Sequence, residues 1–180
     1  MLPAPPASID PDDPRFAEQQ AAVRLLFFDF DGVFTDNAVF VFEDGREAVR
    51  ASRFDGIGLR RLERAGVEGF ILSTEVNPVV TARAGKLKIG CRQGLSDKIA
   101  AAREVAAERG LALEACGFVG NDVNDIPLLQ AVGLPLGVAD AHEDIHPYVR
   151  WLTRRSGGHG AVREVCDAIG AARGVEPRYP

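Results

Sequence analysis

Two aspartates, Asp29 and Asp31, close an almost unbroken apolar run that begins at Val23. Residues two apart on a strand point to the same face, so both carboxylates are expected to project from one strand end. Burying two acids there is costly unless a cation or a proton compensates their charge. The pair therefore predicts a site that holds a cation or a proton. The alternative is a structural pair in which one acid hydrogen-bonds the next loop.

A second group of side-chain oxygens follows another apolar segment, at residues 120–125 (GNDVND). Mg²⁺ prefers carboxylate, amide and water oxygens, so this density of oxygens at a strand end suits a hard cation. The alternative is an Asx-rich turn that caps a helix beginning near Ile126. Neither acidic group has the glycine and closing glutamate of an EF-hand loop, which excludes that kind of calcium site.

Two further polar residues occupy positions where they could hold a phosphate. Ser73 follows the predicted strand 67–72, and its hydroxyl can donate to a phosphate oxygen. Lys98 opens a predicted helix, where its charge opposes the helix dipole; anion binding by the ammonium and backbone N–H groups together would explain it. Taken alone, each has a simpler explanation, a turn or cap serine and a solvated surface lysine.

The elements that position these residues alternate between strand and helix. We expect strands at 23–31, 67–72, 115–119, 134–138 and 151–153, and helices at 56–65, 78–86, 97–109, 126–131 and 161–172, with Ser96 as the cap of the third helix. Residues 39–54 are expected to form a β-hairpin that turns at Asp44-Gly45. Such alternation predicts an α/β fold with a parallel sheet covered by helices. Ligands bind beyond the carboxyl ends of such strands, where the polar residues above are found.

The composition limits the class of protein. The chain has 180 residues, of which 46% are hydrophobic and 26% charged, and its formal net charge is −5. An acidic balance argues against a nucleic-acid or membrane-surface partner, and no apolar run is long enough for a membrane span. Three cysteines without a C-x-x-C pair favour reduced, buried thiols in a cytoplasmic protein.

The order of these signals on one α/β chain resembles the haloacid dehalogenase superfamily of phosphohydrolases, over residues 23–172. The motifs that narrow the resemblance are DFDGVFTD (29–36), RFDGIG (53–58), DAH (140–142) and GGHGAVRE (157–164). They look like the small branch without a cap domain. That branch holds the 3-deoxy-D-manno-octulosonate 8-phosphate and 2-keto-3-deoxynonulosonate 9-phosphate phosphatases, and the phosphatase-like domain of N-acylneuraminate cytidylyltransferases. The segments STEVNP (73–78) and GNDVND (120–125) look closest to the cytidylyltransferase-associated members.

The resemblance implies a three-layer, Rossmann-like parallel sheet with a projecting hairpin at about 37–54 and no cap domain. The phosphatase domain would span 23–172, between a proline-rich N-terminal tail (1–22) and a C-terminal tail (173–180).

The resemblance also implies a Mg²⁺-dependent phosphatase with an aspartyl-phosphate intermediate. Asp29 would be the nucleophile and Asp31 the general acid and base, while Ser73 and Lys98 would hold the phosphoryl oxygens. The implied metal ligands are Asp29, Asp31 and Asn121, with Asp122 as a further ligand; Asp125 and Gly32 would be supporting residues. The family usually has aspartate where this chain has Asn121, which predicts weaker metal binding.

The implied substrate is a 2-keto-3-deoxy sugar acid phosphate of the nonulosonate, or sialic-acid, type. Octulosonate phosphatases carry an arginine after the second-strand hydroxyl, whereas this chain has Glu75, and Lys86 matches the lysine of the nonulosonate pattern. Thr74 and His159 are further candidate substrate contacts. The alternatives are an octulosonate 8-phosphate phosphatase, and a weakly active or inactive oligomerisation module associated with an N-acylneuraminate cytidylyltransferase.

The relatives without a cap that the chain resembles form homotetramers in which the hairpin covers a neighbour's active site. Residues 39–42 (VFVF) are apolar on both faces of the predicted hairpin, which suits an interface better than solvent. The resemblance therefore predicts a homotetramer.

Overall fold

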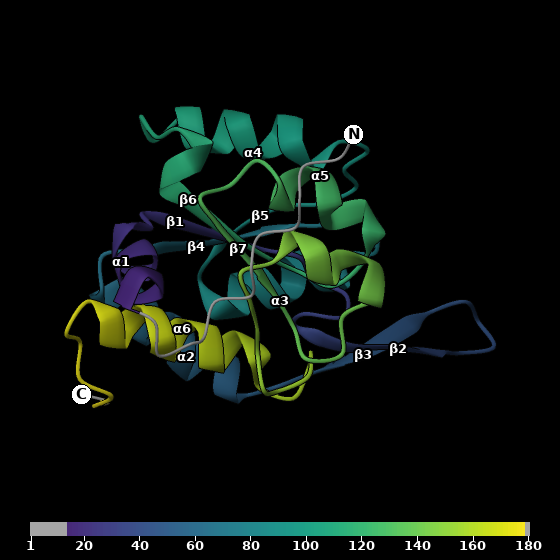
Figure 1. Cartoon of the computed structure of the whole chain (residues 1–180). Coiled ribbons are helices and arrows are strands. Elements are labelled where there is room, and N and C mark those ends of the chain that lie inside the picture. Colours follow the sequence, from purple (N-terminus) through teal and green to yellow (C-terminus); the bar gives the residue numbers. More distant parts are fainter. Residues whose placement is uncertain (1–13, 179–180) are drawn as a thin grey trace.

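The computed structural model describes residues 14–178. Its centre is a six-stranded sheet, entirely parallel, in the order β5-β4-β1-β6-β7-β8 (Figure 1). The strands are β1 (Leu25–Phe28), β4 (Glu68–Leu72), β5 (Gly90–Arg92), β6 (Cys116–Gly120), β7 (Leu134–Gly137) and β8 (Trp151–Leu152). All four residues of β1 are buried because helices cover both faces of the sheet. The predicted α/β fold with a parallel sheet is confirmed.

Helices form a layer on each side of the sheet. They are α1 (Pro14–Ala22), α2 (Phe54–Arg64), α3 (Val79–Leu87), α4 (Lys98–Ala107), α5 (Ile126–Leu129) and α6 (Ala161–Ala172). Short 3₁₀ turns lie at Leu113–Ala115, Val123–Asp125 and Glu143–Tyr148. In Figure 1, α4 and α5 lie above the sheet, and α1, α2, α3 and α6 lie below it. The result is the three-layer arrangement that the resemblance implies.

The packed structure begins before residue 23 and continues past residue 172. Phe16 of α1 is buried, with its ring edge-on to Trp151 at a centroid distance of 5.6 Å. After α6, the guanidinium of Arg61 donates to the Val175 carbonyl. The described parts of both predicted tails therefore belong to the packed domain. Phe16 fills part of the core, and the Val175 carbonyl accepts a hydrogen bond from the buried Arg61. Residues 1–13 of the predicted N-terminal tail lie outside the described part of the chain.

Two local expectations differ from the structure. The cap of α4 is Asp97 rather than Ser96, because the Asp97 side chain accepts from the Ala100 N–H at 3.0 Å and α4 starts at Lys98. The strand β5 was not predicted, since its three residues are too few to show a period.

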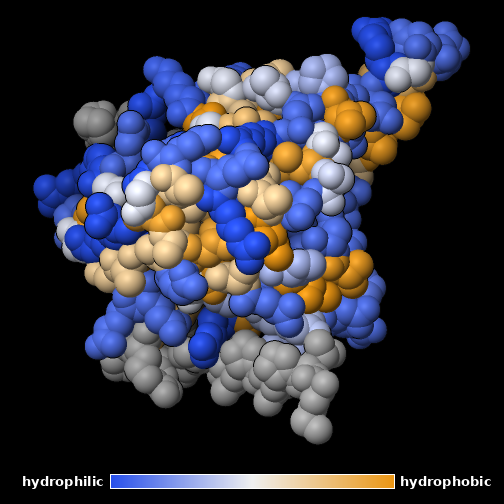
Figure 2. All heavy atoms as spheres, turned by 90° about the horizontal axis from the view of Figure 1, so that it is seen from above, coloured by the Kyte–Doolittle hydropathy of each residue, from blue (hydrophilic) through white to orange (hydrophobic). Residues whose placement is uncertain are grey.

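The hairpin projects from the body of the molecule as a separate two-stranded sheet of β2 (Thr35–Val41) and β3 (Glu47–Ala51) (Figures 1 and 2). Gly45 has a φ of +82°, which an L side chain rarely adopts, so the predicted turn at Asp44-Gly45 is confirmed. Residues 39–42 are 51%, 62%, 68% and 49% exposed in order, although all four are apolar. Among residues 14–178, no helix is long and apolar enough to cross a membrane.

Candidate functional site

The predicted site residues meet at the carboxyl ends of three neighbouring strands. Asp29 follows β1, Ser73 follows β4, and Asn121 follows β6. Since β1 lies between β4 and β6 and all three are parallel, their carboxyl ends share one edge of the sheet. Lys98 reaches the same edge from the first residue of α4. The sequence therefore brings four separate segments to one place.

A buried ion network joins three of these elements. Lys98 Nζ lies 2.9 Å from Asp29 Oδ1 and 2.6 Å from Asp125 Oδ1. The other Asp125 oxygen accepts from the Asn121 N–H at 2.8 Å. Asp125 therefore pairs with Lys98 and fixes both the lysine and the loop after β6.

Burial and charge shift the titration of this network. Burial raises the pKa of the Asp29 carboxyl to about 7; repulsion from Asp125 adds to the rise and Lys98 opposes it. Burial also disfavours the charged form of Lys98, but the attraction of Asp29 and Asp125 outweighs it and raises the pKa of the lysine. Lys98 therefore stays charged and holds Asp29 in place.

Three oxygen-bearing groups face one another beside Asp29. The Asn121 amide oxygen points at the Asp31 carbonyl oxygen, 3.1 Å away, and at Asp29 Oδ2, 3.3 Å away. Turning the amide over would place its nitrogen there as a hydrogen-bond donor to both oxygens. Either a cation between the oxygens or the turned amide satisfies this contact. Gly32 is required here, because a Cβ at its positive φ would lie 2.1 Å from Asn121 Nδ2.

The structure gives Asp122 a different position from the one expected of a metal ligand. Its carboxylate caps the 3₁₀ turn after β6, accepting from the Val123 N–H at 2.7 Å. Within residues 14–178, no three side chains of the Asp, Glu, His and Cys types form a group that could hold a metal ion. Asp122 is therefore not grouped with Asp29 and Asp31 in this structure, and its role as a further metal ligand stays a prediction.

Thr35 is a site residue that the sequence analysis missed. This fully buried side chain donates to Asp31 Oδ1 at 3.3 Å and accepts from the Gly32 N–H at 3.1 Å. Burial raises the pKa of the Asp31 carboxyl, and the Thr35 hydrogen bond partly opposes that rise. The sequence signal for this residue is a hydroxyl side chain four positions after Asp31. The contact itself depends on how the chain turns after β1.

Side chains of the loop after β4 accept hydrogen bonds from backbone N–H groups of the same loop. Ser73 Oγ accepts from the Glu75 N–H at 3.1 Å, and its hydroxyl hydrogen can still be donated to another acceptor. Glu75 Oε1 accepts from the N–H groups of Val76 and Asn77, each at 2.7 Å. Thr74 is exposed beside them. The loop thus presents Ser73 at the sheet edge with a fixed orientation.

A cleft of about 280 Å³ opens beside Asp31. It is lined by Asp31, Glu47, Glu75 and the neighbouring residues Asn37, Asn77 and Val79, among others. Glu47 is the first residue of β3 and accepts from Asn77 Nδ2 at 3.1 Å, so the hairpin forms one wall. Repulsion from Glu75 and Glu47 also raises the pKa of Asp31. The cleft is a concave, acidic space next to Asp31.

Two predicted substrate contacts lie outside this cleft. Lys86 is exposed in the last turn of α3, and none of the hydrogen bonds or ion pairs among the described residues joins it to the site. The His159 ring contacts the Arg50 guanidinium at the hairpin base, and Arg50 also pairs with Asp36. His159 Nε2 is the acceptor in this contact because arginine can only donate.

The segment that carries His159 packs directly on the aspartate loop. A Cβ added to Gly157 would lie 1.8 Å from the Gly32 carbonyl oxygen. The Gly157 N–H donates to Asp140 Oδ1 at 2.9 Å, and the Gly158 N–H donates to the Val33 carbonyl at 3.1 Å. The motifs at 140–142 and 157–164 therefore fix the backbone that follows Asp31.

Comparison with known proteins gives consistent matches. Residues 86–165 match the family model of haloacid dehalogenase-like hydrolases. The 3-deoxy-D-manno-octulosonate 8-phosphate phosphatase of Yersinia pestis is 37% identical over 153 residues, which cover 84% of this chain and 82% of that protein.

Two solved structures also match. One is a Streptomyces avermitilis protein assigned to the haloacid dehalogenase hydrolases, with 44% identity, a TM-score of 0.79 and coverage of 82% and 84% of the two chains. The other is the octulosonate 8-phosphate phosphatase of Moraxella catarrhalis in complex with a magnesium ion, a phosphate ion and its sugar acid. It has 28% identity, a TM-score of 0.84 and coverage of 88% and 91%.

Proposed function

Since the chain belongs to the haloacid dehalogenase-like phosphatases, we propose that it hydrolyses the phosphate monoester of a 2-keto-3-deoxy sugar acid. The observation that carries this proposal is the convergence of Asp29, Lys98 and Asn121 at one sheet edge, beside an open cleft. The Yersinia pestis and Moraxella catarrhalis relatives are named as phosphatases of such a sugar acid phosphate.

The oxygens beside Asp29 fit a divalent cation. Mg²⁺ binds six oxygens at about 2.0–2.1 Å in an octahedron, so adjacent ligands lie about 3 Å apart. The Asn121 amide oxygen lies 3.1 and 3.3 Å from the other two oxygens, close to that spacing. We propose that Asp29, the Asp31 carbonyl and Asn121 hold Mg²⁺, which would offset the charge of the phosphoryl group. The magnesium in the Moraxella catarrhalis complex supports this assignment.

Asp29 is the proposed nucleophile. Its Oδ1 accepts from Lys98 and from the Phe30 N–H at 2.7 Å, which orients the carboxylate. Attack on phosphorus forms an aspartyl-phosphate and divides the hydrolysis into two easier steps. Burial favours the protonated acid, so the cations beside Asp29 are needed to keep it ionised.

Asp31 is the proposed general acid and base. Its raised pKa and its position at the cleft allow it to protonate the leaving alkoxide and then to take a proton from the attacking water. Thr35 holds one oxygen of the carboxyl, and the other is the oxygen that we propose exchanges protons with the reacting groups. Ser73 and Lys98 are the proposed donors to the phosphoryl oxygens.

The cleft supports a polyhydroxylated substrate. Carboxylates such as Glu47 and Glu75 accept hydrogen bonds from hydroxyl groups. Together with the resemblance at Glu75, this supports a nonulosonate 9-phosphate, whose nine-carbon chain has one more hydroxyl-bearing carbon than the octulosonate. The relatives named above act on the octulosonate 8-phosphate, which is the second candidate. Lys86 lies outside the cleft of its own copy, so it would have to contact substrate bound in the cleft of a neighbouring copy.

The exposed hairpin supports an oligomer. Residues 39–42 present four apolar side chains to solvent in one copy, and such a surface is stable when another copy covers it. We propose the homotetramer that the resemblance implies, with the hairpin of one copy beside the cleft of the next.

One observation favours a second function. Asn121 gives the proposed metal site one charge less than an aspartate would, which suits a weakly active or inactive module associated with a cytidylyltransferase. Against it stands the intact network of Asp29, Lys98 and Asp125, which an inactive module does not need.

The test is phosphate release from a panel of sugar acid phosphates, with Mg²⁺ and with chelator. Turnover of the nonulosonate 9-phosphate that is lost with chelator is the expected result. Preference for the octulosonate 8-phosphate would keep the phosphatase and overturn the role given to Glu75. No release from any substrate by folded protein with excess Mg²⁺ would favour the inactive module.

A further inference from the structure

An arginine-lined pocket lies on the outer face of α2, away from the site described above. It has a volume of about 120 Å³. Its charged lining is five arginines and one glutamate: Arg60, Arg61, Arg64, Arg163, Arg178 and Glu63. This concentration of positive charge stands out in a chain whose net charge is −5.

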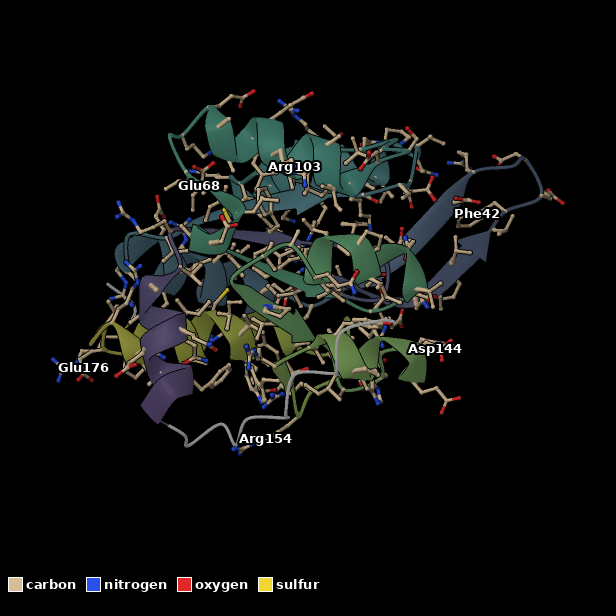
Figure 3. The ribbon with its side chains drawn as sticks, turned by 45° about the horizontal axis from the view of Figure 1, so that its top comes forward. Phe42, Glu68, Arg103, Asp144, Arg154 and Glu176 are labelled. Atoms are coloured by element: carbon tan, nitrogen blue, oxygen red, sulfur yellow. The ribbon has the colours of Figure 1, made fainter. Side chains whose placement is uncertain are left out.

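The architecture of the pocket comes from the way the chain returns after α6. Arg61 is buried, and its guanidinium donates to the Val175 carbonyl and pairs with Asp167 at 3.1 Å. Arg64 donates to the Glu176 carbonyl at 3.1 Å. These contacts hold the C-terminal segment along α2, and the pocket lies between the helix and that segment. In Figure 3, Glu176 and Phe42 of the hairpin lie at opposite ends of the molecule.

These contacts do not explain why Arg60 and Arg178 line the pocket. Among residues 14–178, neither Arg60 nor Arg178 forms a hydrogen bond or an ion pair. The C-terminal dipole of α2 favours Arg61 and Arg64 in its last turn, but it does not account for Arg178, which lies outside the helix. Like charges that share a hollow repel one another unless an anion lies between them.

We propose that this pocket binds a phosphate group of a small molecule, as an anion site separate from the catalytic centre. Guanidinium groups match phosphate in shape and charge, and several of them can donate to one phosphate at once. Arg61 supplies a fixed wall, and Arg60 and Arg178 supply donors that can close on the anion. The pocket shares no lining residue with the cleft beside Asp31, so the two sites can be occupied at the same time.

The test is a titration of the full chain with inorganic phosphate in chelator, at constant ionic strength, followed by the Nε–Hε signals of arginine in ¹⁵N NMR spectra. We expect saturable shifts of the Arg60 and Arg178 signals. The double variant Arg60→Ala/Arg178→Ala should raise the Kd for phosphate at this site at least about tenfold, since two charge-assisted contacts are lost. Phosphate should also raise the Tm of the wild type more than that of the double variant.

The matched control is Arg103→Ala, which removes an exposed arginine of α4 that forms no hydrogen bond or ion pair among the described residues. It should bind phosphate as the wild type does. The proposal is overturned if the Arg60 and Arg178 signals do not saturate, or if Arg103→Ala weakens binding as much as the double variant. Phosphate bound at the catalytic centre alone would leave both arginine signals unmoved and would also overturn it.

Discussion

Asp29 and Asp55 are both almost wholly buried carboxyl groups, 6% and 1% exposed, and burial raises the pKa of each to about 7. Their surroundings differ. Asp29 accepts from Lys98 and the Phe30 N–H, and lies beside the Asn121 amide. Neither oxygen of Asp55 has a hydrogen-bond partner within residues 14–178, and only the more distant charge of Arg83 lowers its pKa.

The comparison shows that a shifted pKa does not by itself identify a catalytic group. Both carboxyls are shifted mainly by burial, and only Asp29 has donors that orient it. Asp29 is therefore prepared to carry charge in the folded protein, while Asp55 is best accommodated as a neutral acid. Variants of these two aspartates, and of the groups around Asp29, can separate the two roles.

Replacing Asp29 by Asn should abolish phosphate release, with a loss of at least about 10⁴-fold, because the amide cannot act as the nucleophile. The fold should be retained, since the amide has the same shape and removes a buried charge. Phosphate release is measured beside circular dichroism and thermal unfolding. Activity within tenfold of the wild type in a folded variant would contradict the role of Asp29.

Replacing Asp55 by Asn should leave activity unchanged and should alter how stability depends on pH. The pKa of Asp55 rises from 3.8 to about 7 on folding. Between these values the unfolded chain loses its proton and the native chain keeps it, so the wild type loses stability as the pH rises, by up to about 4 kcal/mol in total. Unfolding by denaturant at several pH values measures this difference.

The stability of Asp55→Asn relative to the wild type should increase by roughly 2–3 kcal/mol between pH 5 and pH 8. A difference that stays constant with pH would show that Asp55 is not neutral in the folded protein. Asp29→Asn is the matched comparison, since it removes a carboxyl that burial shifts in the same direction but should also abolish activity.

Replacing Lys98 by Met should lower kcat/KM by about 10²–10³-fold, because a donor to the phosphoryl group is lost and Asp29 is left beside Asp125 without its cation. Thermal unfolding shows how much of the loss comes from the fold. Full activity in the folded variant would exclude Lys98 from the site.

Replacing Asn121 by Asp should tighten Mg²⁺ binding by about tenfold, because the third oxygen then carries a charge. In chelator the same variant should unfold at a lower temperature, since the new carboxylate repels Asp29. A Mg²⁺ titration followed by thermal unfolding checks both effects. An unchanged Mg²⁺ affinity would contradict the placement of the metal beside residue 121.

Much of the fold could be predicted from the sequence, because long apolar runs and helix signals have a clear period. The strand that ends at Asp29 and the helix that starts near Lys98 were expected within a few residues. The strand β5 and the packed position of α1 were not, because three residues show no period and the packing of Phe16 on Trp151 joins distant segments. Tertiary contacts, which no local pattern records, decide such elements.

The candidate site, too, could be predicted from the sequence only in part. The supporting role that the resemblance implies for Asp125 corresponds to its ion pair with Lys98. The Thr35 hydrogen bond to Asp31, the packing of Gly157 on Gly32 and the cap formed by Asp122 depend on the path of loops, so the sequence did not predict them. The predicted positions of Lys86 and His159 at the substrate also required a geometry that one copy of the chain does not provide.

The central claim is that Asp29, and not another buried acid, receives the phosphoryl group. The most direct measurement is acid quenching of the enzyme during turnover of a ³²P-labelled substrate, followed by peptide mapping of the label. We predict label on the peptide that contains Asp29 in the wild type and in Asp55→Asn, and no label in Asp29→Asn. Label on another residue, or turnover that persists in Asp29→Asn, would contradict the account.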